Sequence, residues 1–248
     1  ARGKRRMKHV HMPKVDARYW ASITMASIFG TNLGDFYAHE SGLGIVAGVG
    51  ILAALAGLVF LAERRDTRAH ELYYWLVIII IRTGATNIAD YLAFRVHIPA
   101  IPLSIALGAA IAGFAAWMAM TESKAEIEAN RGLPDTDGKY WVAMLFAGVF
   151  GTVLGDVCSH YYTEANASLG LGLILAVILL GRWQGIVAAI PGYWLTVSVA
   201  RTAGTAMGDW LAENKIFDIG LSVSTLITGC VFVGILLLWR SATRLNQA

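Results

Sequence analysis

Four aspartates recur along the chain in a pattern that could bind or relay a cation. Each aspartate lies fifteen residues after a tryptophan and four residues after a threonine. The aspartates are Asp35, Asp90, Asp156 and Asp209, and the threonines are Thr31, Thr86, Thr152 and Thr205. Carboxylates inside apolar segments are costly and mark ion pathways or proton relays. We therefore expect these eight residues to form an ion-binding site or a proton relay, in which the threonines add hydroxyl oxygens.

Two of the aspartates are followed by a histidine on the same helix face. His39 comes four residues after Asp35, and His160 comes four residues after Asp156. Residues four apart are neighbours on a helix, and carboxylate with imidazole suits zinc, iron, manganese or nickel. The predicted metal ligands are therefore Asp35, His39, Asp156 and His160, and the suggested cofactor is a divalent metal ion. Two alternatives stay open, namely ordinary histidines at the membrane surface and histidines that bind haem.

The other two aspartates are each preceded by an arginine. Arg82 and Arg201 lie eight residues before Asp90 and Asp209. Four aspartates and two arginines leave a net negative charge, and buried charge must be offset by protonation, a bound cation or water. We expect the arginines to tune the charge of the cluster. The plainer alternative is that aspartate and arginine pair as internal staples, or that the aspartates hydrogen-bond to neighbouring helices.

The composition places these residues in a membrane protein. Of the 248 residues 56% are hydrophobic and only 15% are charged, against about 25% charged in soluble proteins. This excludes a disordered chain, a nucleic-acid-binding module and an ordinary soluble enzyme. A transmembrane helix needs about 20 apolar residues, and eight segments qualify. They are 19–38, 43–62, 72–94, 100–120, 140–162, 167–181, which looks short, 186–211 and 217–239.

The eight segments predict an all-α polytopic integral membrane protein in two halves. We expect a first four-helix half over 19–120, a linker over 121–139 and a second half over 140–240. A basic tail over 1–18 and a tail over 241–248 flank them. Sixteen of the 20 lysines and arginines fall on the side of both chain ends, and two fall on the opposite side. Positive residues favour the cytoplasmic side, so both tails and the linker are predicted to be cytoplasmic.

An internal repeat organises the chain. The string Y-W-x9-[GA]-T-x-x-[GA]-D occurs in the first, third, fifth and seventh segments, which predicts four parallel two-helix repeats. Histidines in repeats one and three, and arginines in repeats two and four, predict halves related by a pseudo-two-fold axis. Tyr-Trp is interpreted as an interfacial anchor, and the small residues as points of close helix approach.

The polar residues of each repeat fall on one side of its first helix. The predicted stripe contains the residues 11, 7 and 4 positions before each aspartate, the aspartate, and the residue four positions after it. Apart from Asp218 at the edge of the last one, the apolar stretch of the second helix in each repeat has no charged residue. We therefore expect the four striped helices in the middle and the four apolar helices outside, facing lipid.

The repeats resemble a bacterial membrane family of unknown function, built from four tandem repeats of two transmembrane segments with a shared tryptophan. The resemblance covers residues 19–239 and rests on YW with GTNLGD, ATNIAD, GTVLGD and GTAMGD. Repeats of that family usually carry a glutamate where this chain has its four threonines, so the chain is similar to a divergent member. The resemblance implies an architecture and a bacterial inner membrane, but no activity.

The main functional hypothesis is a transporter or channel for a small cation, because internal repeats that meet at a polar site are a common transporter plan. A second hypothesis is a non-transporting membrane subunit or scaffold held by Asp and Arg staples. A third is an integral-membrane enzyme or cofactor holder that uses the two histidines. Beyond lipid and a cation, the sequence names no partner and no oligomeric state.

Overall fold

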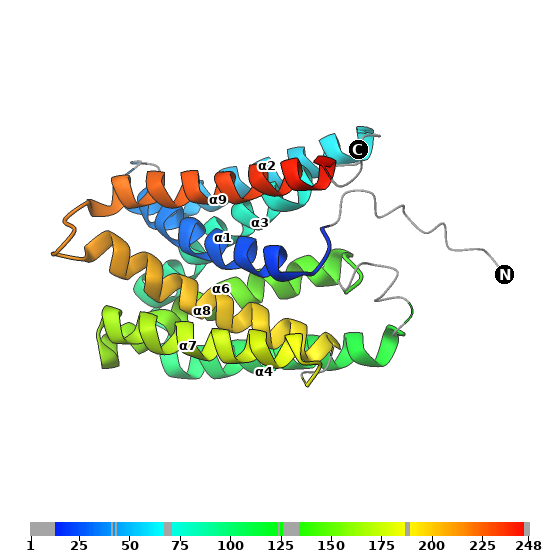
Figure 1. Ribbon diagram of the computed structural model, residues 1–248. Coiled ribbons are helices and arrows are strands. Elements are labelled where there is room, and N and C mark those ends of the chain that lie inside the picture. Colours follow the sequence, from blue (N-terminus) through cyan, green and yellow to red (C-terminus); the bar gives the residue numbers. More distant parts are fainter. Residues whose placement is uncertain are drawn as a thin grey trace.

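The protein is a bundle of long helices. The computed structural model describes residues 13–40, 42, 44–66, 71–123, 125, 134–186 and 189–245. Within these residues it contains eight α-helices and no strand (Figure 1). The helices are α1 (Ala17–Asp35), α2 (Ile45–Arg65), α3 (Leu72–Asp90), α4 (Ala100–Thr121), α6 (Gly138–Tyr162), α7 (Glu164–Trp183), α8 (Ala189–Glu213) and α9 (Gly220–Leu245). They correspond to the eight predicted spans; the sixth is 20 residues long, and the eighth extends past the predicted end.

Two π-helical turns continue the first two striped helices. The turn η1 (Phe36–Glu40) follows α1, and the turn η2 (Tyr91–Arg95) follows α3. The third and fourth striped helices, α6 and α8, remain α-helical beyond their aspartates. The first half of the chain therefore differs from the second at the level of the aspartates.

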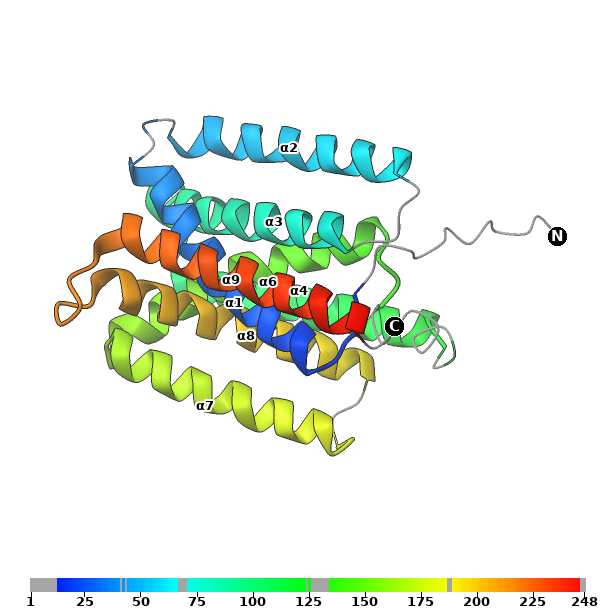
Figure 2. The ribbon, with the colours of Figure 1, turned by 45° about the horizontal axis from the view of Figure 1, so that its top comes forward.

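The first helices of the four repeats form an inner ring. Helix α1 packs against α3, α3 against α6, α6 against α8, and α8 against α1. Each outer helix packs mainly against the inner helix of the following repeat. Thus α2 covers α3, α4 covers α6, α7 covers α8, and α9 closes the cycle on α1 (Figure 2). This exchange links the four repeats into one closed structure, in which the striped helices lie inside as predicted.

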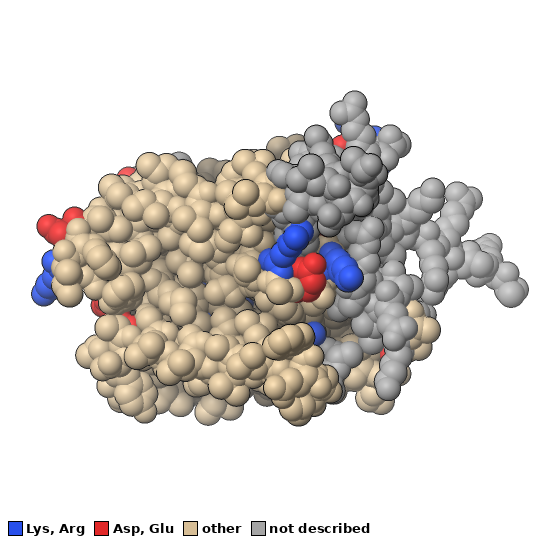
Figure 3. All heavy atoms as spheres, viewed as in Figure 1, with Lys and Arg blue, Asp and Glu red and all other residues tan. Residues whose placement is uncertain are grey.

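Polarity follows this arrangement. Six of the described helices are long and apolar enough to cross a membrane, and α1 and α8 are the two that fall outside this group. Both belong to the inner ring, where they are covered by neighbours, so their surfaces need not suit lipid. On the face seen in Figure 3, charged atoms lie at one end and in a second group nearer the other end, and the broad surface between the two groups is uncharged. The architecture is that of a helical membrane protein.

Two of the inner helices begin with the same cap. The side chain of Asp16 accepts hydrogen bonds from the backbone N–H groups of Arg18 and Tyr19, and that of Asp137 from those of Lys139 and Tyr140. An aspartate at this position satisfies amide groups that the first turn leaves free. The shared cap supports a duplication of the two halves.

Small residues bring neighbouring inner helices close together, as predicted. The residue five positions before each aspartate faces the residue eight positions before the aspartate of the next repeat. The pairs are Gly30 with Arg82, Ala85 with Gly148, Gly151 with Arg201, and Gly204 with Ser27. A Cβ atom on Gly30 would lie 2.5 Å from Cγ of Arg82, so a larger residue has no room there. Where repeat two has the larger Ala85, its partner is a glycine.

Parts of the predicted domain plan lie outside the described residues. These are residues 1–12 of the basic tail, residues 124 and 126–133 of the linker, and residues 246–248. The cytoplasmic position of the tails therefore remains a prediction.

Candidate functional site

The side chains that face the middle of the inner ring recur every four residues. Counting back from each aspartate, a threonine stands at four, a serine, arginine or glycine at eight, an apolar residue at twelve and a tyrosine at sixteen. We call the two ends of this column the tyrosine end and the aspartate end. Rows of residues four apart run at about 26° to a helix axis, so the inner helices must slant around the column. The predicted stripe used a shorter average spacing. Three of its residues seven positions before the aspartates, Thr83, Val149 and Thr202, are buried as predicted, but the column itself continues through the residues eight, twelve and sixteen positions before each aspartate.

A closed ring of four hydroxyl groups lies at the tyrosine end. Tyr19 bonds to Tyr74 and Tyr193, and Tyr140 bonds to the same two, with O–O distances of 2.6–2.7 Å. All four side chains are at most 2% exposed. The prediction that Tyr-Trp is an interfacial anchor was therefore wrong for the tyrosines. The tyrosine lies sixteen residues before the aspartate and so shares its face of the helix.

The tryptophans next to these tyrosines pack around the outside of the ring. Each packs edge-on against its own tyrosine and also against the tyrosine of the preceding repeat. The second set of contacts joins Trp75 to Tyr19, Trp141 to Tyr74, Trp194 to Tyr140 and Trp20 to Tyr193, at centroid distances of 5.6–5.8 Å. Such separations suit attractive aromatic pairs. Trp20, Trp75 and Trp194 are at most 6% exposed, so these rings, too, belong to the core.

The four threonines meet around one guanidinium. Nη1 of Arg82 donates to Thr86 and Thr152 at 2.9 and 2.8 Å, and Nη2 donates to Thr31 and Thr205 at 2.5 and 2.6 Å. Arg82 is completely buried. One residue from every repeat therefore binds the same tethered cation. We call this arrangement the threonine–arginine clamp.

Arg201 comes from the same level of the column but points the other way. It is also completely buried. Its Nη1 lies 3.3 Å from Oγ of Ser27, and its Nη2 lies 3.4 Å from Sδ of Met144, one layer nearer the tyrosine end. Its hydrogen bonds are thus fewer and longer than those of Arg82.

The four aspartates form the layer beyond the clamp. Asp90 is 8% exposed, Asp35 and Asp209 are half-buried, and Asp156 is exposed. Asp35 interacts electrostatically with Asp90 and Asp156, and Arg82 interacts with Asp35, Asp156 and Asp209. In the described part of the chain no aspartate forms an ion pair with either arginine. The aspartates therefore share the field of Arg82 without being stapled to it.

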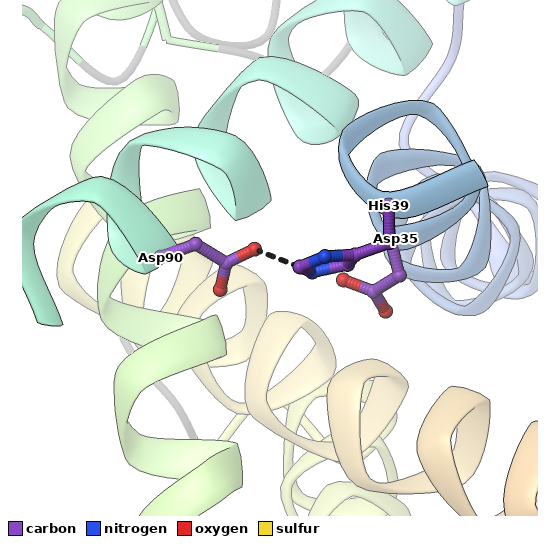
Figure 4. A group of neighbouring side chains, drawn as sticks. All are labelled: Asp35, His39 and Asp90. Carbon is purple, nitrogen blue, oxygen red and sulfur yellow. Dashed lines mark ion pairs between the residues drawn. The ribbon is translucent and has the colours of Figure 1, made fainter. Parts of the chain in front are cut away.

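Three potential ligands converge between α1 and α3. One ligand atom each from Asp35, His39 and Asp90 lies within 4.8 Å of the others, and Figure 4 shows the three side chains pointing toward one another. Nε2 of His39 is 3.8 Å from Oδ2 of Asp90. That oxygen is buried and has no hydrogen-bond partner. A buried carboxylate oxygen that accepts no hydrogen bond carries a desolvation cost, which a bound cation would offset.

The π turns explain why these residues meet. His39 lies in η1, directly after Asp35, whereas His160 lies within the regular helix α6. A π turn winds more residues into each turn than an α-helix, so His39 and His160 point in different directions relative to their aspartates. Both histidines are exposed. Asp156 and His160, predicted as metal ligands with Asp35 and His39, do not join the group; Asp90 takes their place among the described residues.

Sequence reasoning missed the tyrosine ring and the clamp. The signal was present, because tyrosine, threonine and aspartate stand at multiples of four in every repeat. A residue sixteen positions before the aspartate faces the same axis only when the helix is slanted, and this is why Tyr-Trp suggested a membrane anchor instead. Which arginine enters the clamp is not marked in the sequence, since Arg82 and Arg201 occupy equivalent positions.

Comparison with known proteins finds a repeat family but no known activity. Residues 18–68 and 192–244 match a family model described as a Repeat of Unknown Function (DUF347). These segments are the first and fourth repeats of the chain. Neither the curated proteins nor the solved structures include a significant match. Two of the four repeats thus match a repeat family of unknown function, which confirms the resemblance found in the sequence.

Proposed function

We propose that the protein is a carrier that binds a small cation at the aspartate end of its column and moves it across the membrane. The observation that supports this most directly is the group of Asp35, His39 and Asp90, with its buried carboxylate oxygen that accepts no hydrogen bond. Internal repeats around a polar site near the membrane interior are typical of transporters. The proposal places the protein in a bacterial inner membrane with both chain ends cytoplasmic.

The charge of the column favours a positive ligand. Four carboxylates gather in one layer, and only the guanidinium of Arg82 extends toward them, as its bonds to the threonines require. Arg201 reaches toward the tyrosine end instead. The aspartate layer therefore keeps an excess of negative charge. Removing that charge from water is costly unless a counter-charge is present, and a cation from solution would supply it.

The closed column favours a carrier over an open channel. Along the axis, the guanidinium of Arg82 fills the space between the four threonines, and the four tyrosine hydroxyls close the column again at the tyrosine end. An arginine on a conduction path repels cations. In this conformation the aspartates are thus accessible from one end only. Transport would require the repeats to rearrange so that the clamp opens, in the manner of alternating access.

Uptake into proteoliposomes tests the proposal. We expect one or more of the cations H⁺, Na⁺, K⁺, Mn²⁺, Co²⁺ and Zn²⁺ to be taken up by the wild type. The double variant Asp35→Asn/Asp90→Asn should abolish that uptake and remain folded. Asp218→Asn is the matched control, because Asp218 lies in the turn between α8 and α9 with φ of 46°, a conformation that asparagine tolerates. A folded wild type that carries none of these ions would refute the proposal.

A non-transporting membrane subunit is the second candidate. The clamp and the tyrosine ring favour it, because both link all four repeats through polar contacts that a scaffold would also need. This candidate predicts a stoichiometric complex on purification and no ion flux. It further predicts that Asp35→Asn/Asp90→Asn leaves complex formation intact, since neither aspartate takes part in the clamp.

A further inference from the structure

We propose that Asp35, His39 and Asp90 form a binding site for one divalent transition-metal ion. The inference deepens the proposed function by naming the class of cation, and it rests on that function only for the statement that the ion is cargo. The site is asymmetric: it lies between the first two repeats and uses neither Asp156 nor His160.

The ligand set selects the class of ion. The two carboxylates neutralise a divalent cation and the neutral imidazole adds a third ligand, whereas a monovalent cation would balance only one of the two carboxylates. Imidazole suits zinc, copper, iron and nickel, while magnesium and calcium prefer oxygen ligands. His39 therefore favours a transition metal over the more abundant hard cations.

The geometry is close to that of an occupied site. Metal–ligand bonds of about 2.1 Å place ligand atoms of a tetrahedral site about 3.4 Å apart. His39 Nε2 and Asp90 Oδ2 are already 3.8 Å apart, and all three ligand atoms lie within 4.8 Å. The His39 side chain is 59% exposed, so it can turn inward without disturbing the packing. Three protein ligands leave further positions open for water, as an exchangeable site requires.

Asp90 gives the site an anchor that the other repeats lack. Its side chain is 10% exposed, and Oδ2 has no hydrogen-bond partner. This oxygen points toward Asp35 and His39 across the space between α1 and α3 (Figure 4). The two groups that face it are thus Asp35 and His39. A bound metal ion would satisfy the oxygen and screen the two carboxylates from each other.

The chain supplies matched variants for the test. The residue four positions after the aspartate is His39 in repeat one, Phe94 in repeat two and His160 in repeat three. His39→Phe therefore installs the residue that repeat two already carries. His160→Phe makes the same change at the equivalent position outside the proposed site. Far-UV circular dichroism and size-exclusion profiles confirm folding of both variants before binding is measured.

Binding to the purified full chain in nanodiscs is measured by calorimetry with Co²⁺ and with Mg²⁺. We expect one Co²⁺ per chain, with Mg²⁺ weaker by at least about tenfold. His39→Phe should weaken Co²⁺ binding by at least about tenfold, because even the loss of a group that only orients a metal ligand typically costs about 10–100-fold, and it should leave Mg²⁺ binding unchanged. Cu²⁺ electron spin-echo spectra should contain the nitrogen modulation of one imidazole, which His39→Phe removes. His160→Phe should change none of these results.

Several outcomes overturn the inference. Equal affinities for Co²⁺ and Mg²⁺, an unchanged Co²⁺ affinity in His39→Phe, or an equal loss in His160→Phe would each exclude the proposed ligand set. Uptake of H⁺, Na⁺ or K⁺ without Co²⁺ binding would refute the metal site while the carrier function stands. Binding of Co²⁺ with no uptake of any cation would support the site and refute the carrier function.

Discussion

Replacing one tyrosine of the ring with phenylalanine should destabilise the protein more than replacing all four. In the closed ring each hydroxyl has one proton and donates it to the next hydroxyl. Tyr74→Phe removes two of the four bonds and leaves one neighbouring hydroxyl proton without an acceptor. Interhelical hydrogen bonds in membranes contribute about 0.6 kcal/mol each, and an unsatisfied buried donor costs about 1–3 kcal/mol. The single variant should therefore lose about 2–4 kcal/mol of unfolding free energy.

The quadruple variant removes every hydroxyl and leaves no buried polar group unpaired. Replacing both partners of a hydrogen bond by apolar groups of the same shape is nearly neutral. We expect its unfolding free energy to lie within about 1 kcal/mol of the wild type. Two double variants remove the same number of hydroxyls but leave different hydrogen bonds. Tyr140→Phe/Tyr193→Phe leaves the bond between Tyr19 and Tyr74, whereas Tyr19→Phe/Tyr140→Phe leaves two isolated hydroxyls. The second pair of substitutions should therefore be the more destabilising.

Equilibrium unfolding in lipid–detergent micelles measures these differences. The signal is tryptophan fluorescence, because Trp20, Trp75 and Trp194 pack on the ring and are buried. Near-ultraviolet circular dichroism of the folded variants checks that the aromatic packing is retained. Additive losses, in which the quadruple variant falls by four times the single effect and both double variants agree, would refute the closed ring.

Three further predictions concern the column. Gly30→Ala should lower the unfolding free energy by about 1–3 kcal/mol, because the new Cβ meets the Arg82 side chain. The control Gly57→Ala, whose new Cβ has no atom within 4 Å, should be neutral or stabilising by up to about 1 kcal/mol. Thermal unfolding of the two variants measures this difference. Arg82→Ser should lower the unfolding free energy by about 1–3 kcal/mol, because it removes the guanidinium that donates to all four threonines, and an unchanged unfolding free energy would contradict the clamp. Arg201→Met should be neutral or stabilising in the same unfolding assay, because apolar replacement of a poorly paired buried charge is often favourable. If Arg201→Met lowers the unfolding free energy as much as Arg82→Met, the weak hydrogen bonding of Arg201 is contradicted.

The sequence allowed the architecture to be predicted because the repeat constrains it strongly. Four copies of one spacing require four similar hairpins, and apolar length sets where each helix spans. The small residues before Thr31 and Thr205 predicted close helix contact, and Gly30 and Gly204 make it. Burial of polar stripes and exposure of apolar helices follow from the cost of polar groups in lipid, so the inner and outer helices were also predictable.

The details of the column depend on features that residue types alone do not reveal. The slant of the inner helices decides whether a residue seven or eight positions before the aspartate faces the axis. Because the residue at eight faces it, Arg82 and Arg201 lie in the centre of the ring. The π turn after Asp35 has no local sequence signature, yet it brings His39 toward Asp90. A symmetric metal site was therefore predicted where the structure has an asymmetric group.

Crowding on the axis explains why equivalent residues differ in their contacts. Arg82 and Arg201 come from opposite helices of the ring at the same level, where Ser27 and Gly148 provide the space. Two guanidinium groups at one point would repel each other, so only one can occupy the four threonines. Arg82 does so, and Arg201 turns toward Met144 and the tyrosine end. The tyrosines, threonines and aspartates shared by all four repeats thus form the symmetric column. Its symmetry is broken by the residues that differ between repeats, which stand eight positions before and four positions after each aspartate. Ligand selectivity should therefore change when those variable positions are exchanged between repeats, and it should change less when a shared tyrosine is replaced by phenylalanine.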